Sequence, residues 1–385
     1  MNTTKRTMIW KRGLCAALTL LMLLLSACGA KADTPATAAV PATTAAPATT
    51  EAPASTTAPE TVQPTEAPST EPVKTEPPAT EAPTAEPTEP QPTEPTEFVP
   101  DPNWPTGSCG DDLTWYFDAK SGRLTIVGSG DMVESDQNHS EDFGVTSPWQ
   151  EYREQIKTIS LPEGLTSIGN FAFYDCMALT SVTIPSNVTF IGEEAFGHCK
   201  QLTQVTLECG AVDVQWDVAF RTCVRLKEFV VPDDNPAYSS VDGVLFDRAQ
   251  TKLIYYPFAK TTRVYHVPDG VTEIGEAAFL DQDNMIGVII PDSVTEIGDN
   301  AFAGCGKLKD VTIGSGVTRI GEDAFLTCGL SEVTIPETVR EIGAHAFGYA
   351  LYSKYISKSD FVVRGAAGSA AEAYATENGF RFAAQ

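Results

Sequence analysis

The sequence predicts a solenoid, either mostly β or of α/β type, in which small units of about 23 residues stack along one axis. The first observation behind this prediction is a spacing: the pattern Ile-Gly-x-x-Ala-Phe-x-x-Cys occurs at 168–176, 191–199, 297–305 and 320–328, and degraded copies begin at Val214, Ile274 and Ile342. The second observation is a run of alternating apolar residues before each copy, which is the pattern of a half-buried strand. Units of this length cannot bury an apolar face alone, so neighbouring units must share one core.

Each unit is expected to contain the same elements in the same order. A short strand such as 182–184 or 333–335 places alternate side chains in the core and ends at a proline, which has no N–H to donate to a ladder. The glycine after each isoleucine indicates a tight bend, with either a positive φ or a close backbone approach. Burial of a phenyl ring contributes roughly 1.5–3 kcal/mol, so a stacked column of phenylalanines is a leading source of stability. The expected members of this column are Phe173, Phe196, Phe220, Phe279, Phe302, Phe325 and Phe347.

The repeat resembles the BspA-type leucine-rich repeat of bacterial cell-surface proteins, whose unit reads approximately LxxVxIPxxVxxIGxxAFxxC. Residues 179–199 carry this pattern almost without departure, and the resemblance covers residues 156–385. It implies a right-handed leucine-rich-repeat coil with N- and C-terminal caps, and a role in extracellular adhesion or in binding a host protein. We therefore expect an N-terminal β cap at 101–155, a solenoid at 156–360 and a C-terminal cap at 361–385.

One insertion, residues 235–262, interrupts the repeat. Its segments Val244–Phe246 and Leu253–Tyr256 predict a β-hairpin. The aromatic residues of this insertion have two interpretations: they pack inside an elaborated structural unit, or they form part of a binding surface, where aromatic side chains are favoured. Under the second interpretation, Tyr255 and Tyr256 are candidate ligand contacts.

The outward side chains of the strands form a second candidate surface, because the sheet of a solenoid commonly binds the ligand. These side chains are small and polar in the N-terminal half of the solenoid and apolar in its middle. We predict that a ligand binds in this middle region. The candidate residues there are Val230, Val264, His266 and Ile289.

The first 27 residues have the pattern of a signal peptide, with basic residues at 5, 6, 11 and 12 before an apolar run at 14–25. The sequence Leu25-Ser26-Ala27-Cys28 resembles a bacterial lipobox, which implies lipidation of Cys28 and an anchor on the extracellular face of a bacterial cell membrane. The alternatives are a general signal peptide cut near Ala27 or Ala30, or an uncleaved anchor. An uncleaved anchor is disfavoured because a bilayer span needs about 20 apolar residues.

Residues 28–100 are expected to form a disordered stalk between the lipid and the solenoid. Residues 33–99 contain 15 of the 27 prolines of the chain, among threonine, alanine, serine and glutamate. This composition cannot bury a core and favours an extended tether.

Charge and motifs exclude several function classes. The net charge of −25 argues against a nucleic-acid partner, whose recognition depends on basic patches. No nucleophile elbow, phosphate-binding loop or zinc-protease motif occurs, and the EF-hand spacing is absent, so we expect no enzymatic activity, no cofactor and no metal. The cysteines at one repeat position favour free buried thiols, whereas Cys109 and Cys209 lie outside that register and are better candidates for covalent pairing. The cysteines in register are Cys176, Cys199, Cys223, Cys305 and Cys328.

The sequence therefore predicts a lipid-anchored, stalked surface protein whose solenoid mediates adhesion or binds an extracellular protein or glycan. The main alternative is a structural component of the envelope with no dedicated ligand. An unrecognised hydrolase is a third possibility, for which no site assembles in the sequence.

Overall fold

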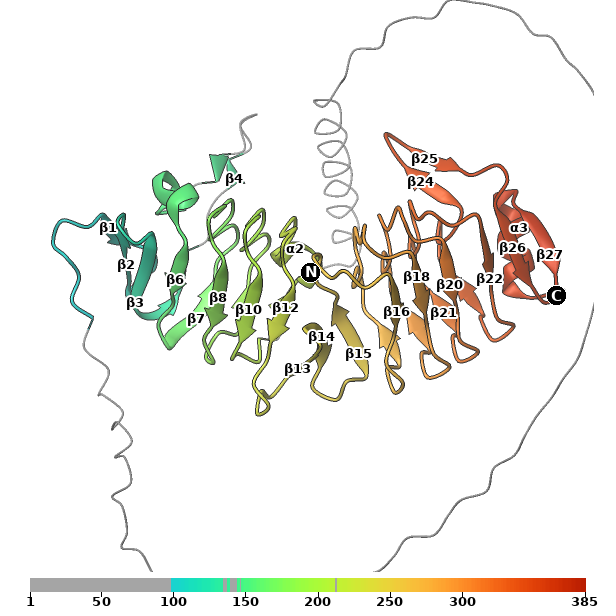
Figure 1. The fold of residues 1–385 in the computed structure, drawn as a ribbon, viewed down its shortest axis with the longest axis horizontal. Coiled ribbons are helices and arrows are strands. Elements are labelled where there is room, and N and C mark those ends of the chain that lie inside the picture. Colours follow the sequence, from blue (N-terminus) through green and yellow to red (C-terminus); the bar gives the residue numbers. More distant parts are fainter. Residues whose placement is uncertain (1–97, 134–136, 139–143, 146, 212) are drawn as a thin grey trace, which may run out of the picture. The chain divides into compact units, whose positions relative to one another are not determined.

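The structure is a computed structural model that describes residues 98–133, 137–138, 144–145, 147–211 and 213–385. From residue 99 onward these residues belong to one compact unit, a mostly β solenoid whose parallel strands lie side by side in successive rungs (Figure 1). A rung here is one turn of the coil. The predicted fold class is thus confirmed. The signal peptide, Cys28 and the stalk lie outside the described residues and stay predictions.

Two parallel ladders run along the solenoid, and both begin at β3 (Arg123–Asp131). The start of β3 pairs with β6, and its end pairs with β7. The first ladder is interrupted twice, which divides it into three separate sheets. Its further strands are β6 (Thr158–Ser160), β8 (Ser181–Ile184), β10 (Gln204–Leu207) and β12 (Glu228–Val230), then β16 (Val264–His266), β18 (Gly287–Ile289) and β20 (Asp310–Thr312), then β22 (Glu332–Thr334), β26 (Val362–Gly365) and β27 (Arg381–Ala384).

The second ladder consists of shorter strands that contain the isoleucine of the repeat. It also stops once, before the insertion, and a new sheet begins with the insertion's own strands β13 (Tyr238–Val241) and β14 (Val244–Asp247). The parallel strands of this ladder are β7 (Gly164–Ile168), β9 (Phe190–Ile191) and β11 (Asp213–Val214), then β15 (Lys252–Tyr255), β17 (Glu273–Ile274), β19 (Glu296–Ile297), β21 (Arg319–Ile320) and β23 (Glu341–Ile342).

Atypical elements cover both ends of the stack. At the N-terminal end β1 (Thr106–Ser108) and β2 (Leu113–Asp118) pair antiparallel in front of β3, and the 3-10 helix η1 (Gln150–Gln155) precedes β6. The short strands β4 (Gln137–Asn138) and β5 (Gly144–Val145) pair with each other. At the C-terminal end, helix α3 (Ala370–Asn378) joins β26 to β27. These elements cover the apolar ends that an open solenoid would otherwise expose.

Two elements depart from the simple repeat. The four-residue helix α2 (Trp216–Ala219) lies in the rung before the insertion. A hairpin of β24 (Tyr349–Leu351) and β25 (Tyr355–Ser357) follows the last repeat copy, and sequence analysis did not anticipate it. The structure thus adds a hairpin within 156–360, where only solenoid rungs and the insertion were expected.

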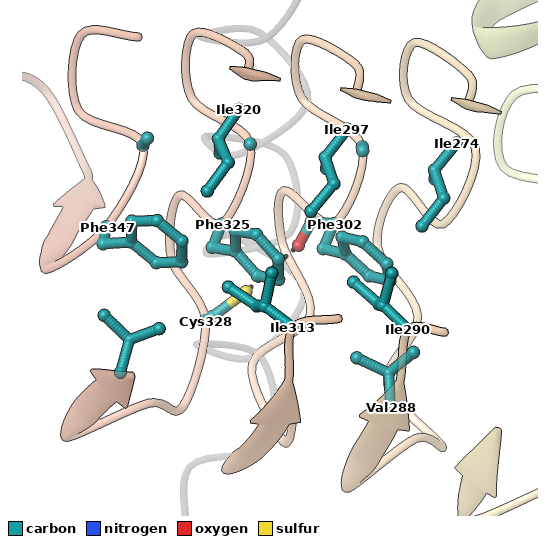
Figure 2. Close-up of a cluster of buried hydrophobic side chains, with 14 of the residues drawn as sticks. Ile274, Val288, Ile290, Ile297, Phe302, Ile313, Ile320, Phe325, Cys328 and Phe347 are labelled. Carbon is teal, nitrogen blue, oxygen red and sulfur yellow. Dashed lines mark hydrogen bonds between the residues drawn. The ribbon is translucent and has the colours of Figure 1, made fainter. Parts of the chain in front are cut away.

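The predicted phenylalanine column is confirmed, since all seven rings are at most 1% exposed. Figure 2 shows Phe302, Phe325 and Phe347 in line, with Ile274, Ile297 and Ile320 in a parallel row. Within each half of the solenoid neighbouring rings stack with centroids 4.6–5.3 Å apart. Trp149 precedes the first half and stacks on Phe173 at 5.2 Å.

In five rungs the glycine after the isoleucine is required by close backbone approach. A Cβ atom at Gly321 would lie 2.5 Å from the backbone nitrogen of Asp299, and one at Gly298 would lie 2.7 Å from that of Glu276. The positive φ falls two residues later instead, for example at Asn300 with φ 55°. Of the two reasons considered for this glycine, the structure therefore supports the approach of the adjacent rung.

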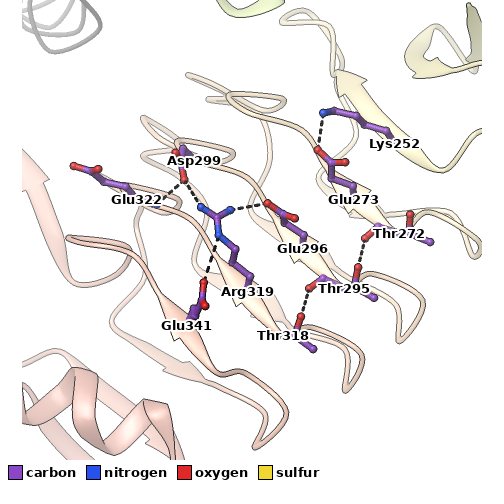
Figure 3. A network of polar contacts seen from close by, with 10 residues as sticks. All are labelled: Lys252, Thr272, Glu273, Thr295, Glu296, Asp299, Thr318, Arg319, Glu322 and Glu341. Carbon is purple, nitrogen blue, oxygen red and sulfur yellow. Dashed lines mark hydrogen bonds and ion pairs between the residues drawn. The ribbon is translucent and has the colours of Figure 1, made fainter. Parts of the chain in front are cut away.

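Polar side chains add register-specific contacts along the second ladder. The hydroxyl of Thr318 donates to the carbonyl oxygen of Thr295, and the hydroxyl of Thr295 donates to that of Thr272, both at 3.1 Å. Arg319 reaches Glu296 at 2.6 Å, and Figure 3 shows its guanidinium between Glu296 and Asp299 of the preceding rung and Glu341 of the following rung. Because the arginine is 41% exposed, each ion pair contributes at most about 1 kcal/mol, and the network chiefly fixes which rungs are neighbours.

Candidate binding surface

An exposed aliphatic patch lies where β16 and β18 pair. Val264 is 43% exposed and Ile289 is 37% exposed, whereas the alternate residues Tyr265 and Val288 face the core. The pairing sets Val264 opposite Gly287 and His266 opposite Ile289, so three of the predicted residues share one small area. We call Val264, His266, Gly287 and Ile289 the aliphatic patch.

Glycine at position 287 determines the shape of the patch. A Cβ atom there would lie 3.4 Å from Cγ2 of Val264, which means that the valine side chain lies over the bare backbone of Gly287. The patch therefore presents a low surface with no long or charged side chain of its own. Its aliphatic groups lose contact with water when a partner covers them, which contributes roughly 25 cal/mol per Å² of buried apolar area.

Val230 lies on the other side of a break in the first ladder. The turn at Asp242 and Gly243 occupies this break: the N–H of Phe229 donates to the carbonyl of Gly243 at 3.0 Å, and Lys260 donates to the carbonyl of Asp242. Val230, 37% exposed, thus belongs to a different sheet from the aliphatic patch. The predicted apolar middle is divided in two, and sequence analysis did not foresee the division.

The turn that divides the surface is a two-residue hairpin connection. Both Asp242 (φ 54°) and Gly243 (φ 75°) are left-handed, which is the geometry of a type I′ turn between β13 and β14. The Asp-Gly pair is the usual sequence signal of this turn. Val241, directly before the turn, is 40% exposed and adds an aliphatic side chain near the break.

The two tyrosines predicted as ligand contacts belong to the core instead. Tyr256 is 2% exposed and its ring stacks on Phe279 at 4.8 Å, so its assignment to the surface is wrong. Tyr255 is partly buried and packs edge-on against Phe229 at 5.4 Å. Burial raises the pKa of Tyr255 far above its usual range. We therefore remove both residues from the candidate surface.

The insertion joins two hydrophobic cores, which explains its aromatic content. β14 and β15 pair antiparallel, as the sequence predicts. Side chains of β14 alternate between the cores: Leu245 packs in the N-terminal core, and Val244 and Phe246 pack in the C-terminal core. A segment between two cores needs apolar side chains on both faces, so the structural interpretation of this insertion holds.

The cysteines in the described part of the chain are all free and buried. This confirms the expectation for the five cysteines in repeat register. Cys109 and Cys209 are also free, so the covalent pairing considered for them does not occur in this structure. In four rungs the thiol donates to the carbonyl of a column residue, for example from Cys199 to Phe173 at 3.2 Å.

An open groove of about 1000 Å³ lies beside η1. Its lining is mostly polar, and the ring of Trp115, the one tryptophan in it, is 6% exposed. Tyr152 also lines the groove and is half-buried, so a sugar ring would find only part of one further aromatic side chain to stack on. The aliphatic patch therefore stays the better candidate for binding a partner.

Comparisons with known proteins agree with the architecture. A family model described as the BspA type leucine-rich repeat region matches residues 151–250 and 237–354. A comparison with curated proteins gives no match.

Several solved structures are similar to this chain. A leucine-rich cell surface protein from Faecalibacterium prausnitzii is 20% identical to this chain, with a TM-score of 0.39. The match covers 66% of this chain and 87% of that protein. The pneumococcal vaccine antigen PcpA is 15% identical to this chain, with a TM-score of 0.41. The match covers 72% of this chain and 98% of PcpA. A leucine-rich-repeat protein from Bacteroides capillosus is 28% identical to this chain, with a TM-score of 0.26. The match covers 30% of this chain and 98% of that protein.

Proposed function

Because the chain belongs to the BspA-type leucine-rich-repeat family, we propose that it is a bacterial cell-surface protein whose solenoid binds an extracellular partner. The observation that carries this proposal is the exposure of Val264 and Ile289 on adjacent strands. Exposed aliphatic side chains that adjoin one another are a feature of protein interaction sites. The register of the repeat would accommodate polar residues there, as it does at Thr183 in β8.

A protein is favoured over a glycan as the partner. Protein interfaces gain most of their affinity from a few apolar groups that lose all contact with water, and Val264 and Ile289 are groups of this kind. The patch offers the imidazole of His266 but no phenylalanine, tyrosine or tryptophan ring to stack on a sugar. The function therefore needs binding alone, with no catalytic step.

The N-terminal segment supplies the location under this proposal. Lipidation of Cys28 would hold the chain on the extracellular face of the membrane, and residues 28–100 would act as the stalk. Within the described ranges the structure contains no helix with the length and hydropathy that a bilayer crossing requires.

A capture experiment tests the proposal. The full chain, the double variant Val264→Asp/Ile289→Asp and the control Thr183→Asp are immobilised and exposed to extracellular proteins and to a glycan panel. We expect one partner to bind the unmodified chain and the control but not the double variant. Failure of every chain to capture a partner would favour a structural envelope component without a dedicated ligand.

A further inference from the structure

Three side chains of the kinds that ligate metals lie close together beside Tyr355 of the β24–β25 hairpin. Glu322, Asp323 and His345 each offer a ligand atom, and these atoms all lie within 4.8 Å of one another. Asp323 and His345 occupy the same position of neighbouring rungs, two residues after the repeat glycine, and both have a positive φ. Asp323 is 5% exposed, and the other two are half-buried.

The separation of the two inner ligands matches that of two ligands on one metal ion. Nδ1 of His345 lies 3.4 Å from Oδ1 of Asp323, and this buried nitrogen has no hydrogen-bond partner. Protein N–H···O bonds are usually 2.7–3.2 Å long. In a tetrahedral zinc site with bonds of about 2.0–2.1 Å, two ligand atoms lie about 3.4 Å apart.

A second layer of contacts fixes the orientation of both ligands. The hydroxyl of Tyr355 donates to Oδ2 of Asp323 at 2.8 Å, on the oxygen that does not face His345. The ring of Tyr355 stacks on the imidazole of His345, with centroids 3.8 Å apart and planes 11° apart. The rings of Tyr349 and His345 pack in a T-shaped arrangement with centroids 4.9 Å apart. Metal ligands in proteins are oriented by outer contacts of this kind.

The geometry points to a binding site for Zn²⁺ at Glu322, Asp323 and His345, and we propose that the metal fastens the β24–β25 hairpin to the solenoid. One imidazole and two carboxylates suit zinc, whereas calcium takes oxygen ligands alone. The two carboxylates balance the charge of the ion, and water completes four-coordination. In Figure 3 the Glu322 carboxylate points away from the Arg319 guanidinium.

The site departs from the expectation that the chain binds no metal. Its residues come from different rungs, 322–323 and 345, so they form no local motif in the sequence. The chain offers an internal comparison at His198 and Asp175, where Nδ1 and Oδ1 are 3.5 Å apart. That pair lacks a third ligand among the described residues, so it is a matched control.

Zinc titration of the full chain after chelator treatment tests the proposal. We expect calorimetry to show Zn²⁺ binding that His345→Phe and Asp323→Asn each weaken at least about tenfold. The phenyl ring retains the stacking on Tyr355, and asparagine retains the shape of the aspartate, so both variants should keep the fold. The control His198→Phe should bind Zn²⁺ like the unmodified chain.

A structural readout accompanies the titration. Saturating Zn²⁺ should raise the melting temperature of the unmodified chain and of His198→Phe, and should slow proteolysis within 349–357, because a ligand that binds only the folded state stabilises it. Neither change should occur in His345→Phe or Asp323→Asn. Absence of Zn²⁺ binding in the unmodified chain, or binding that survives in both variants, would overturn the proposal.

Discussion

Tyr256 stacks on Phe279 with centroids 4.8 Å apart and an angle of 27° between the rings, so a tyrosine outside the repeat pattern opens the second half of the phenylalanine column. The backbone agrees with this assignment. The N–H of Tyr256 donates to the carbonyl of Ala278, just as the N–H of Phe279 donates to that of Ala301. Gln282, at the cysteine position of its rung, donates to the carbonyl of Tyr256 at 3.0 Å. The insertion thus ends in a rung with the normal contacts.

Truncation of Tyr256 should therefore act on stability. We expect Tyr256→Ala to lower the free energy of unfolding by about 3–5 kcal/mol, the usual cost of deleting a large buried ring. Tyr256→Phe should stay within about 1 kcal/mol, because the ring is retained. Denaturant titrations measure both, and Tyr352→Ala, at a 49% exposed tyrosine, is the control. A small loss for Tyr256→Ala would mean that this ring does not belong to the column.

Much of the fold follows from periodicity. The spacing of Phe302, Phe325 and Phe347 predicts one ring per rung, because each unit repeats the same contacts with its neighbours. The place of Tyr256 could not be predicted in this way, since it lies at the end of an insertion with a different length. The β24–β25 hairpin was missed because the last repeat copy reads directly into it.

The candidate surface could be predicted only in part. Alternation along a strand places Val264 and Ile289 outward, and the structure agrees. Alternation cannot reveal that Tyr255 and Tyr256 face two different cores, since both faces of the insertion are covered. Nor does it show the break beside Val230, which depends on where the Asp242–Gly243 turn packs.

The repeat glycine provides a test of rung spacing. We expect Gly321→Ala to destabilise the fold by about 1–3 kcal/mol or more, because the new Cβ would lie 2.5 Å from the backbone nitrogen of Asp299. Gly306→Ala is the matched control, since a Cβ there would meet only Oδ1 of Asp283 at 3.7 Å. Thermal unfolding of the two variants gives the comparison. Equal melting temperatures would argue against close backbone approach as the reason for this glycine.

The buried thiols predict a loss of stability in alkali. Burial raises the pKa of Cys223 from 9.0 to about 12, so above pH 9 the unfolded chain releases a proton that the folded chain retains. The contribution of this thiol is fully present below pH 9 and declines as pH rises toward 12, by about 1.4 kcal/mol at pH 10. Other groups also titrate in this range, so the test compares the pH dependence of the variant with that of the unmodified chain. The decline in unfolding free energy from pH 8 to pH 10 should be smaller in Cys223→Ala than in the unmodified chain, and an identical decline in both would contradict the shifted pKa.

The anchor can be tested independently of the solenoid. If Cys28 is lipidated, Cys28→Ala should abolish labelling by a fatty-acid analogue and release the protein from the membrane fraction, because stable anchoring needs the acyl chains. Cys15→Ala, in the apolar run at 14–25, is the control and should leave labelling unchanged. Labelling that persists without Cys28 would reject the lipobox interpretation.

The aliphatic patch and Val230 lie on different sheets, so their contributions to binding can be tested separately. If the aliphatic patch is the centre of the interface, a buried charge there is costly, so Val264→Asp and Ile289→Asp should each weaken binding of the captured partner at least about tenfold. Val230→Asp should have a smaller effect, because the Asp242–Gly243 turn separates β12 from β16. Thr183→Asp introduces the same charge at an outward position of β8 and should leave the affinity unchanged. Titration calorimetry gives the affinities and circular dichroism verifies the fold. A loss confined to Val230→Asp would place the interface on the N-terminal sheet, and equal losses at all four positions would indicate repulsion by general charge instead of a local contact.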